Sequence, residues 1–113
     1  MSANLKPDMI LGNKNAKHVI KIEYDGGEDY TQQVLNAIDK LKQRFGDIFQ
    51  YNLYKDKSFS GRLEMTLFWN TKIDHGEGFL IFSKQASKKF PHQDYSSLMD
   101  QVDSVIRMEA PII

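Results

Sequence analysis

The chain has 113 residues, which is enough to bury one hydrophobic core in a single domain without disulfides or a structural metal. Its formal net charge is zero, so it has no strong electrostatic attraction to nucleic acid or to anionic membranes, and neither is an expected partner. The sequence contains no cysteine, which excludes disulfides, thiol catalysis and cysteine-ligated zinc. No stretch approaches the roughly 20 apolar residues that a membrane span needs.

The first part of the chain differs in composition from the rest. Residues 1–17 are polar and show no sustained periodicity, so we expect a flexible N-terminal leader. The longest apolar run in this leader, Met9-Ile10-Leu11, is too short for the core of a signal peptide. We therefore expect a cytoplasmic or nuclear protein with a folded domain at 18–108 and a short tail at 109–113.

The hydrophobic period changes several times along the chain. Apolar residues spaced for a helix occupy about residues 30–45, where Gly46 is placed to end the helix, and a second such stripe follows Phe90. Alternation typical of strands lies between these stripes and before them. The predicted strands are 18–24, 48–54, 62–69 and 79–82, with a polar connection at 70–78.

These elements occur in the order β-α-β-β-β-α. The first strand and helix require a right-handed crossover into a parallel second strand. The later strands are joined by turns, so they should be antiparallel. The order predicts an α/β (α+β) domain with a four-stranded mixed sheet and both helices on one face.

Several short strings resemble the selenoprotein W family, also called the Rdx family. Ile22-Glu23-Tyr24 is similar to the strand that precedes the redox turn of that family. Gly61-Arg62-Leu63-Glu64-Met65 resembles its glycine-x-phenylalanine-glutamate-valine strand. Ile81-Phe82-Ser83-Lys84, followed by Phe90-Pro91, is similar to its last strand and helix start. The resemblance covers about residues 18–108 and implies a thioredoxin-like fold.

The chain departs from the family where its chemistry would lie. The family has a cysteine, two further residues and then a cysteine or selenocysteine, and here Asp25 and Glu28 stand at those two positions. A carboxylate cannot form a disulfide or act as a thiolate nucleophile. The chain also lacks the C-terminal prenylation cysteine of some family members. The redox activity that the resemblance would imply therefore does not carry over, and we expect no cofactor.

The acidic turn is the candidate site that the sequence singles out. We expect a surface for a protein partner around this turn, with aromatic side chains at its edges. A simpler interpretation is that the acidic residues only cap the following helix. Two further alternatives are a cation site and a carboxylate-dependent enzyme using Asp25 and Glu28. The candidate partner surface comprises Tyr24, Asp25, Gly26, Gly27, Glu28, Asp29, Tyr30 and Phe59.

Other patterns give weaker signals. The acidic side chains around Gly26 and Gly27 would repel a phosphate. Asp74-His75-Gly76-Glu77 is more typical of a solvated loop than of a metal site, so no metal site is predicted. We expect a redox-inactive protein-binding module that is a monomer or weak dimer. A variant of this hypothesis keeps an antioxidant role indirectly, through the partner.

Overall fold

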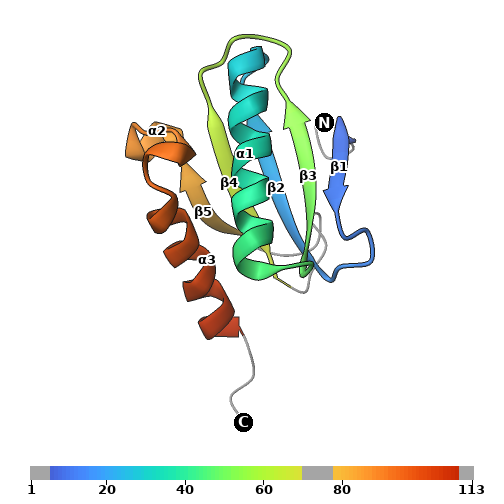
Figure 1. Ribbon diagram of the computed structural model, residues 1–113. Helices are drawn as coiled ribbons and strands as arrows, with labels where there is room; N and C mark the ends of the chain where they lie inside the picture. The colour runs from blue at the N-terminus through green and yellow to red at the C-terminus, as the bar shows by residue number, and fades with distance from the viewer. Residues whose placement is uncertain (1–5, 70–77, 110–113) are drawn as a thin grey trace.

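The structure is a computed structural model that describes residues 6–69 and 78–109, and it has an α/β fold compatible with the thioredoxin-like class. Five strands form one sheet in the order β1-β3-β2-β4-β5 (Figure 1). The strands are β1 (Met9–Gly12), β2 (His18–Tyr24), β3 (Phe49–Lys55), β4 (Leu63–Phe68) and β5 (Phe79–Ser83). The helices are α1 (Glu28–Phe45), α2 (Lys84–Ser87) and α3 (Tyr95–Glu109), with a 3₁₀ turn at Pro91–Gln93.

The central pairings confirm the predicted mixed sheet. Strand β2 is parallel to β3, which the chain reaches through the α1 crossover, and β2 is antiparallel to β4 on its other side. Strand β5 adds antiparallel to β4. In this register Ile22 lies between Leu53 and Met65, so the apolar positions of three strands meet on one face.

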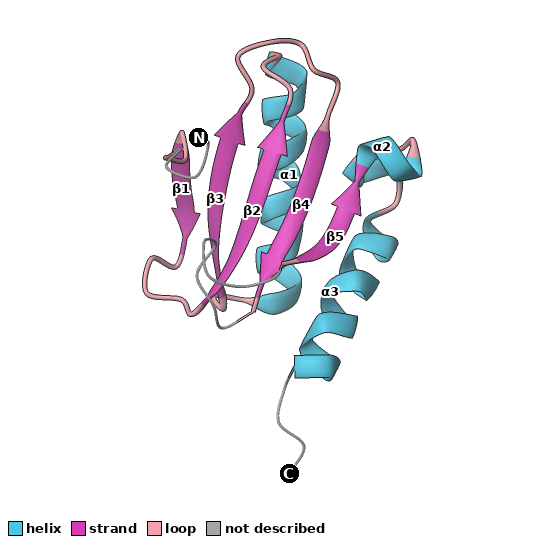
Figure 2. Ribbon diagram, turned by 180° about the vertical axis from the view of Figure 1, so that it is seen from behind, coloured by secondary structure: helices cyan, strands magenta, loops and turns pink. Residues whose placement is uncertain are grey.

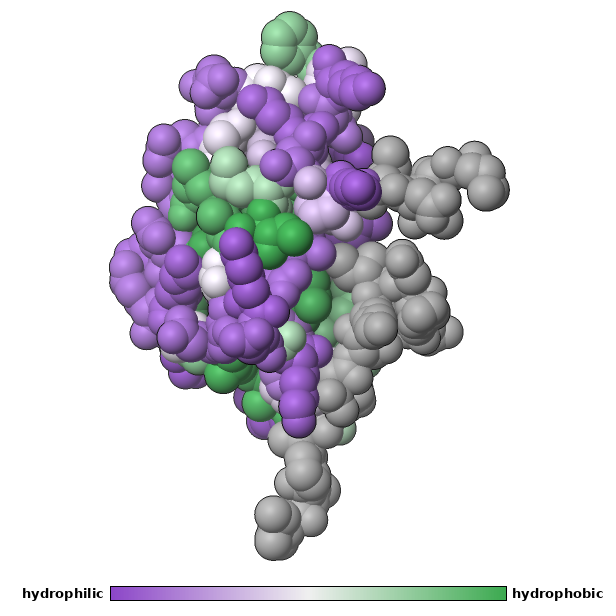
Figure 3. All heavy atoms as spheres, turned by 90° about the vertical axis from the view of Figure 1, so that its right-hand side faces the viewer, coloured by the Kyte–Doolittle hydropathy of each residue, from purple (hydrophilic) through white to green (hydrophobic). Residues whose placement is uncertain are grey.

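The prediction of four strands is wrong, because part of the expected leader is a fifth strand. Strand β1 pairs antiparallel with β3, with Met9 opposite Leu53 and Leu11 opposite Tyr51. It has only four residues, too few for a clear alternating pattern in the sequence. Figure 3 views the molecule from the β1 side and shows apolar surface near its centre, bordered by hydrophilic residues.

The helices occupy one face of the sheet, as predicted, but residues 6–69 and 78–109 contain three of them. Helix α1 lies across the sheet, while α3 packs beside it against β5 (Figures 1 and 2). Gly46 ends α1 with φ 71° and donates its N–H to the Lys42 carbonyl at 2.9 Å, as its position in the sequence predicted. The additional helix, α2, is a single turn in the predicted lysine-rich loop.

The core lies between this helical layer and the sheet. On β2, β3 and β4, alternate side chains point toward the helices and are almost fully buried. The helices contribute apolar stripes with the period of 3.6 that the sequence shows. The most deeply buried apolar residues include Ile20, Ile22, Val34, Leu41, Phe49, Tyr51, Leu53, Leu63, Met65, Leu67, Leu98 and Val102.

Some sequence predictions fall outside the described part of the chain. These are the first five residues of the leader, the polar connection at 70–77 and residues 110–113 of the tail. Among the helices of residues 6–69 and 78–109, none combines the length and apolar character that crossing a bilayer requires.

Amide hydrogen exchange tests whether β1 is part of the sheet. Asn13 donates its N–H to the Phe49 carbonyl at 3.1 Å, and the antiparallel alternation directs the N–H of Leu11 toward β3 as well. We expect the amides of Leu11 and Asn13 to exchange at least about tenfold more slowly than those of Ile10 and Gly12 in a dilute sample. Uniformly fast exchange over residues 9–13 would contradict the fifth strand.

Candidate functional site

Asp25 follows the last residue of β2, and its carboxylate is buried, with the residue only 4% exposed. Its Oδ1 accepts a hydrogen bond from the N–H of Gly27 at 2.7 Å. Its Oδ2 accepts a second hydrogen bond, at 2.6 Å, from the N–H of Gly61, which lies in the connection between β3 and β4. Backbone donors therefore replace water at both oxygens of Asp25.

The start of α1 also differs from the predicted acidic cap. The N-cap residue is Gly27, and no side chain accepts a hydrogen bond there from the first turn of the helix. Glu28 and Asp29 instead occupy the first turn, where negative charge is favourable to the helix dipole. Both are exposed, so their carboxylates are open to other contacts.

The β3–β4 connection, residues 56–62, is joined to the acidic turn by backbone hydrogen bonds. Asp56 donates its N–H to the Tyr24 carbonyl at 2.7 Å, and Gly26 donates its N–H to the Ser58 carbonyl at 3.0 Å. A Cβ atom on Gly26 would lie 2.6 Å from the Asp56 carbonyl oxygen, so the two backbones approach too closely for any other residue. The turn and the connection therefore form one unit.

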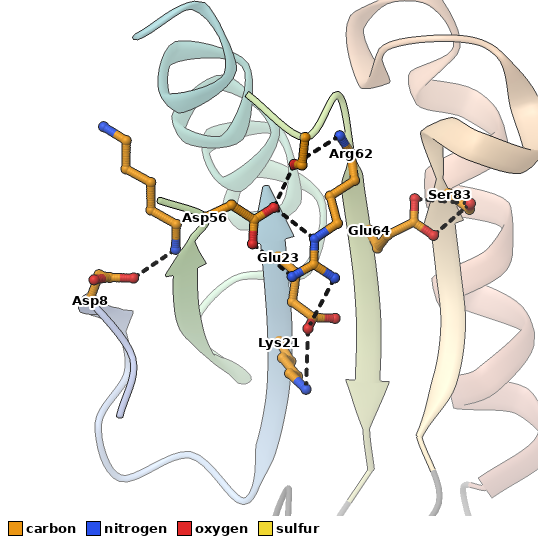
Figure 4. Close-up of polar contacts among 9 residues, drawn as sticks. Asp8, Lys21, Glu23, Asp56, Arg62, Glu64 and Ser83 are labelled. Atoms are coloured by element: carbon orange, nitrogen blue, oxygen red, sulfur yellow. Dashed lines mark hydrogen bonds and ion pairs between the residues drawn. The ribbon is translucent and has the colours of Figure 1, made fainter. Parts of the chain in front are cut away.

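Arg62 fixes the base of this connection on the helix-free face of the sheet. Its Nε and Nη2 donate to the two carboxylate oxygens of Asp56, each at 2.7 Å. Ser60 donates its hydroxyl to the same carboxylate at 2.6 Å, and Glu23 lies 3.4 Å from the Arg62 guanidinium. Figure 4 shows Asp56 and Glu23 pointing toward Arg62 from neighbouring strands. The hydrogen bonds from Arg62 lower the pKa of Asp56 below its ordinary value.

Phe59 lies in this fixed connection with its side chain 86% exposed. Its ring lies beside Gly27, since a Cβ on that glycine would be 3.7 Å from the Phe59 ring. Gly27, Glu28, Asp29, Tyr30 and Phe59 line a shallow depression whose floor includes Asp25. We call these five lining residues the Phe59 surface.

A cation and a second aromatic ring border the Phe59 surface. The Tyr30 ring packs against Phe90, with ring centroids 5.2 Å apart. The Lys84 ammonium lies over both rings, 5.7 Å from the centroid of Tyr30 and 5.2 Å from that of Phe90. It also donates to the carbonyl of Gly61 at 3.2 Å. These contacts order Tyr30 at the edge of the surface.

The structure brings together most of the residues that the sequence suggested for a partner surface. Phe59 is adjacent to the acidic turn although more than thirty residues separate it from Gly27. Tyr24 is different: it is 4% exposed and belongs to the core, so it is not available to a partner. Lys84 and Phe90 were not predicted, because only the fold places them beside Tyr30.

The chemistry open to this site is limited by its hydrogen bonds. Both oxygens of Asp25 already accept backbone N–H groups, and Glu28 has a 92% exposed side chain that lies 3.8 Å from the Lys55 ammonium. Within the described residues, no three histidine, aspartate or glutamate side chains lie close enough together to hold a metal ion. The arrangement offers a contact surface more readily than an acid–base pair.

Comparison with known proteins does not extend this description. No protein-family model, no curated protein and no solved structure matches the chain.

Replacing Asp25 tests its role in joining the two segments. Asp25→Ala would leave the buried N–H groups of Gly27 and Gly61 without an acceptor, and we expect a loss of about 2–4 kcal/mol in the free energy of unfolding. Asp25→Asn should cost about 1–3 kcal/mol, because its amide presents a donor to one of these N–H groups. Urea denaturation measures both.

The matched control for these variants is Asp29→Asn, which removes a nearby carboxylate that is exposed. Its effect should stay within about 0.5 kcal/mol. If Asp25→Asn were as stable as this control, the carboxylate would not be holding the two segments together.

Asp56 predicts a dependence of stability on pH. Its pKa is lower in the folded state than in the unfolded chain, so its ion pair contributes above the unfolded pKa and is lost as the pH falls below about 4. We expect Asp56→Asn to be less stable than the native chain by roughly 1 kcal/mol at pH 6, with the difference shrinking toward pH 2. Urea denaturation at several pH values checks this.

The exposed residue Asp100 on α3 provides the control for the pH series. Asp100→Asn should follow the native pH profile, because no side-chain partner holds its carboxylate in the described part of the chain. A difference between native and Asp56→Asn that stayed constant down to pH 2 would contradict the stabilising role of the ionised Asp56.

Proposed function

We propose that the chain is a redox-inactive relative of selenoprotein W that acts as a protein-binding module, with the Phe59 surface as its contact site. The observation that carries this proposal is a large aromatic side chain, 86% exposed, on a connection whose backbone is fixed to its surroundings. A rigid aromatic residue loses little conformational entropy on binding, which favours its use as an anchor.

The hydrogen bonds around Phe59 support this role. The connection is tied to the turn by Asp25, and to its own base by Asp56 and Arg62. These groups hold the backbone in place but leave the Phe59 ring in solvent. Single exposed apolar side chains are common, so an exposed Phe59 alone would be weak support. The stronger support is that Phe59 and Tyr30 line the same depression.

The charge of the surface suggests the chemistry of the partner. Glu28 and Asp29 are exposed beside Phe59, and the Lys55 ammonium lies 3.8 Å from a carboxylate oxygen of Glu28, at the outer limit of an ion pair. Such an exposed, long pair stabilises little and leaves the surface acidic. We therefore expect a partner segment with lysine or arginine next to an apolar side chain that packs on Phe59.

The relation to the selenoprotein W family is part of the same proposal. The family strings lie on β2, β4, β5 and the 3₁₀ turn before α3, and the turn after β2 is where the redox pair would be. Without a thiol or selenol, this chain cannot exchange disulfides with a partner. An antioxidant role would therefore have to be indirect, through the protein that it binds.

The alternatives have less support. A carboxylate-dependent enzyme would need a free acid or base, whereas both Asp25 oxygens accept backbone N–H groups. A turn with only a structural role accounts for the buried Asp25, but it gives no reason for an exposed Phe59 on the same connection.

A peptide selection tests the proposal and does not require that the partner be identified first. A library of random peptides is selected against the native chain, and the selected peptides are then measured against Phe59→Ala by fluorescence anisotropy. We expect selected peptides to contain basic residues next to an apolar one and to bind Phe59→Ala at least about tenfold more weakly, a loss of about 1.4 kcal/mol. Raising the salt concentration should weaken them further.

The matched control is Leu80→Ala, which removes another exposed apolar side chain, 56% exposed, on β5. Both variants should unfold within about 0.5 kcal/mol of the native chain. Peptides that bound native and Phe59→Ala protein equally would reject the Phe59 surface as the contact site.

A further inference from the structure

Lys84, the first residue of α2, contacts three segments at the border of the Phe59 surface. Its ammonium donates to the carbonyl of Gly61 at 3.2 Å, in the β3–β4 connection. It also lies over the ring of Tyr30 on α1 and over the ring of Phe90, which precedes the 3₁₀ turn, at 5.7 Å and 5.2 Å from their centroids. One cation therefore joins Tyr30, which lines the surface, to the connection that carries Phe59.

Gly61 is held by charged groups on both sides of its Cα atom. Its N–H donates to the carboxylate of Asp25 at 2.6 Å, and its carbonyl accepts from the ammonium of Lys84 at 3.2 Å. Hydrogen bonds to charged groups are stronger than those between neutral groups. Gly61 lies two residues after Phe59 and has a φ of 72°, a left-handed conformation that favours glycine. Because the two bonds hold the peptide groups before and after this residue, they fix the direction in which the chain leaves Phe59.

We infer that Lys84 is a positioning residue of the Phe59 surface, and that its charge sets the place of the Phe59 connection relative to Tyr30. The inference rests on the function proposed above, because it concerns the same contact site. Lys84 is half-buried, and at such a position a cation gains more from an aromatic ring and a carbonyl oxygen than it does in open water. Without this cation the Gly61 carbonyl loses its charged donor, and the connection loses its link to Tyr30.

The charge of Lys84 has two effects on binding that are opposite in sign. Glu28 and Asp29 make the surface acidic, and the proposed partner is basic. A lysine beside this surface repels such a partner, so removing its charge should by itself strengthen binding. Loss of the positioning role should weaken binding instead, because the partner must then order the connection. The direction of the change in affinity therefore separates the two effects.

Peptides selected against the native chain measure this direction by fluorescence anisotropy. Lys84→Met keeps an unbranched apolar side chain but removes the charge and the donor, and we expect it to bind these peptides at least about fivefold more weakly. Lys84→Gln, a second neutral variant, should also bind them more weakly than the native chain. Lys84→Arg keeps the charge and should bind within about threefold of the native chain. Unchanged or higher affinity in both neutral variants would overturn the inference.

The matched control is Lys88→Met, which removes the same charge from an exposed residue directly after α2. Its affinity should stay within about twofold of the native value, because an exposed charge at this distance is screened. Far-UV circular dichroism checks that every variant is folded. A loss of affinity in Lys88→Met as large as that in Lys84→Met would show that the contacts of Lys84 are not the cause, and would overturn the inference.

Amide exchange of Gly61 tests the positioning role in the free protein, without a peptide. Lys84→Met should speed this exchange at least about fivefold, whereas the Gly46 amide, which donates to a carbonyl at the end of α1, should be unaffected. Unchanged exchange at Gly61 would overturn the inference and leave the proposed function standing if Phe59→Ala still binds weakly. Peptides that bound native and Phe59→Ala protein equally would reject the proposed function, and with it the positioning role of Lys84, whatever the exchange at Gly61.

Discussion

The carboxylate of Asp25 holds together the part of the molecule on which the proposed function depends. It is buried at the end of the central strand β2 and accepts N–H groups from two segments, the turn before α1 and the connection before β4. A carboxylate satisfied by two backbone donors replaces its lost hydration in a way that an apolar residue cannot. The Asp25 carboxylate therefore joins two segments that are far apart in the sequence.

The remaining contacts of the connection add to this constraint from the helix-free face. Asp56 and Arg62 make a bidentate ion pair, and Glu23 extends it onto β2. The connection therefore has fixed backbone positions at both ends and in the middle, although Phe59 itself has hardly any contact with the core. The structure thus combines an ordered backbone with an exposed aromatic side chain, the combination on which the proposed contact site rests.

The central fold could be predicted because its elements are long enough to show a period. The alternation on β2 and β4 and the helical stripe of α1 each cover most of an element, and Gly46 marks a helix end by a local rule. Strand β1 and helix α2 have four residues each, too short for a period to be visible. Strand β1 depends on its pairing with β3, which the tertiary structure supplies, whereas α2 begins at a local cap in which the Ser83 hydroxyl accepts the N–H of Ala86.

The candidate site, like the fold, could be predicted from the sequence only in part. The sequence indicates an acidic turn and an aromatic loop, but the bond from Gly61 to Asp25 spans 36 residues and is decided by the fold. Asp25 is buried where these two segments meet, whereas Tyr24 is buried because it continues the inward face of β2 after Ile20 and Ile22. Sequence patterns located the residues, and long-range hydrogen bonds determine which of them a partner could reach.

The proposed contact site requires that the Asp25 carboxylate keep the Phe59 connection rigid in the free protein. Backbone ¹⁵N relaxation of residues 57–61, in the native chain and in Asp25→Asn, measures this rigidity. We expect native order parameters close to about 0.85, as in the strands, and a clear fall in the variant. Native values below about 0.6, or values unchanged in the variant, would show that Asp25 does not hold the connection rigid.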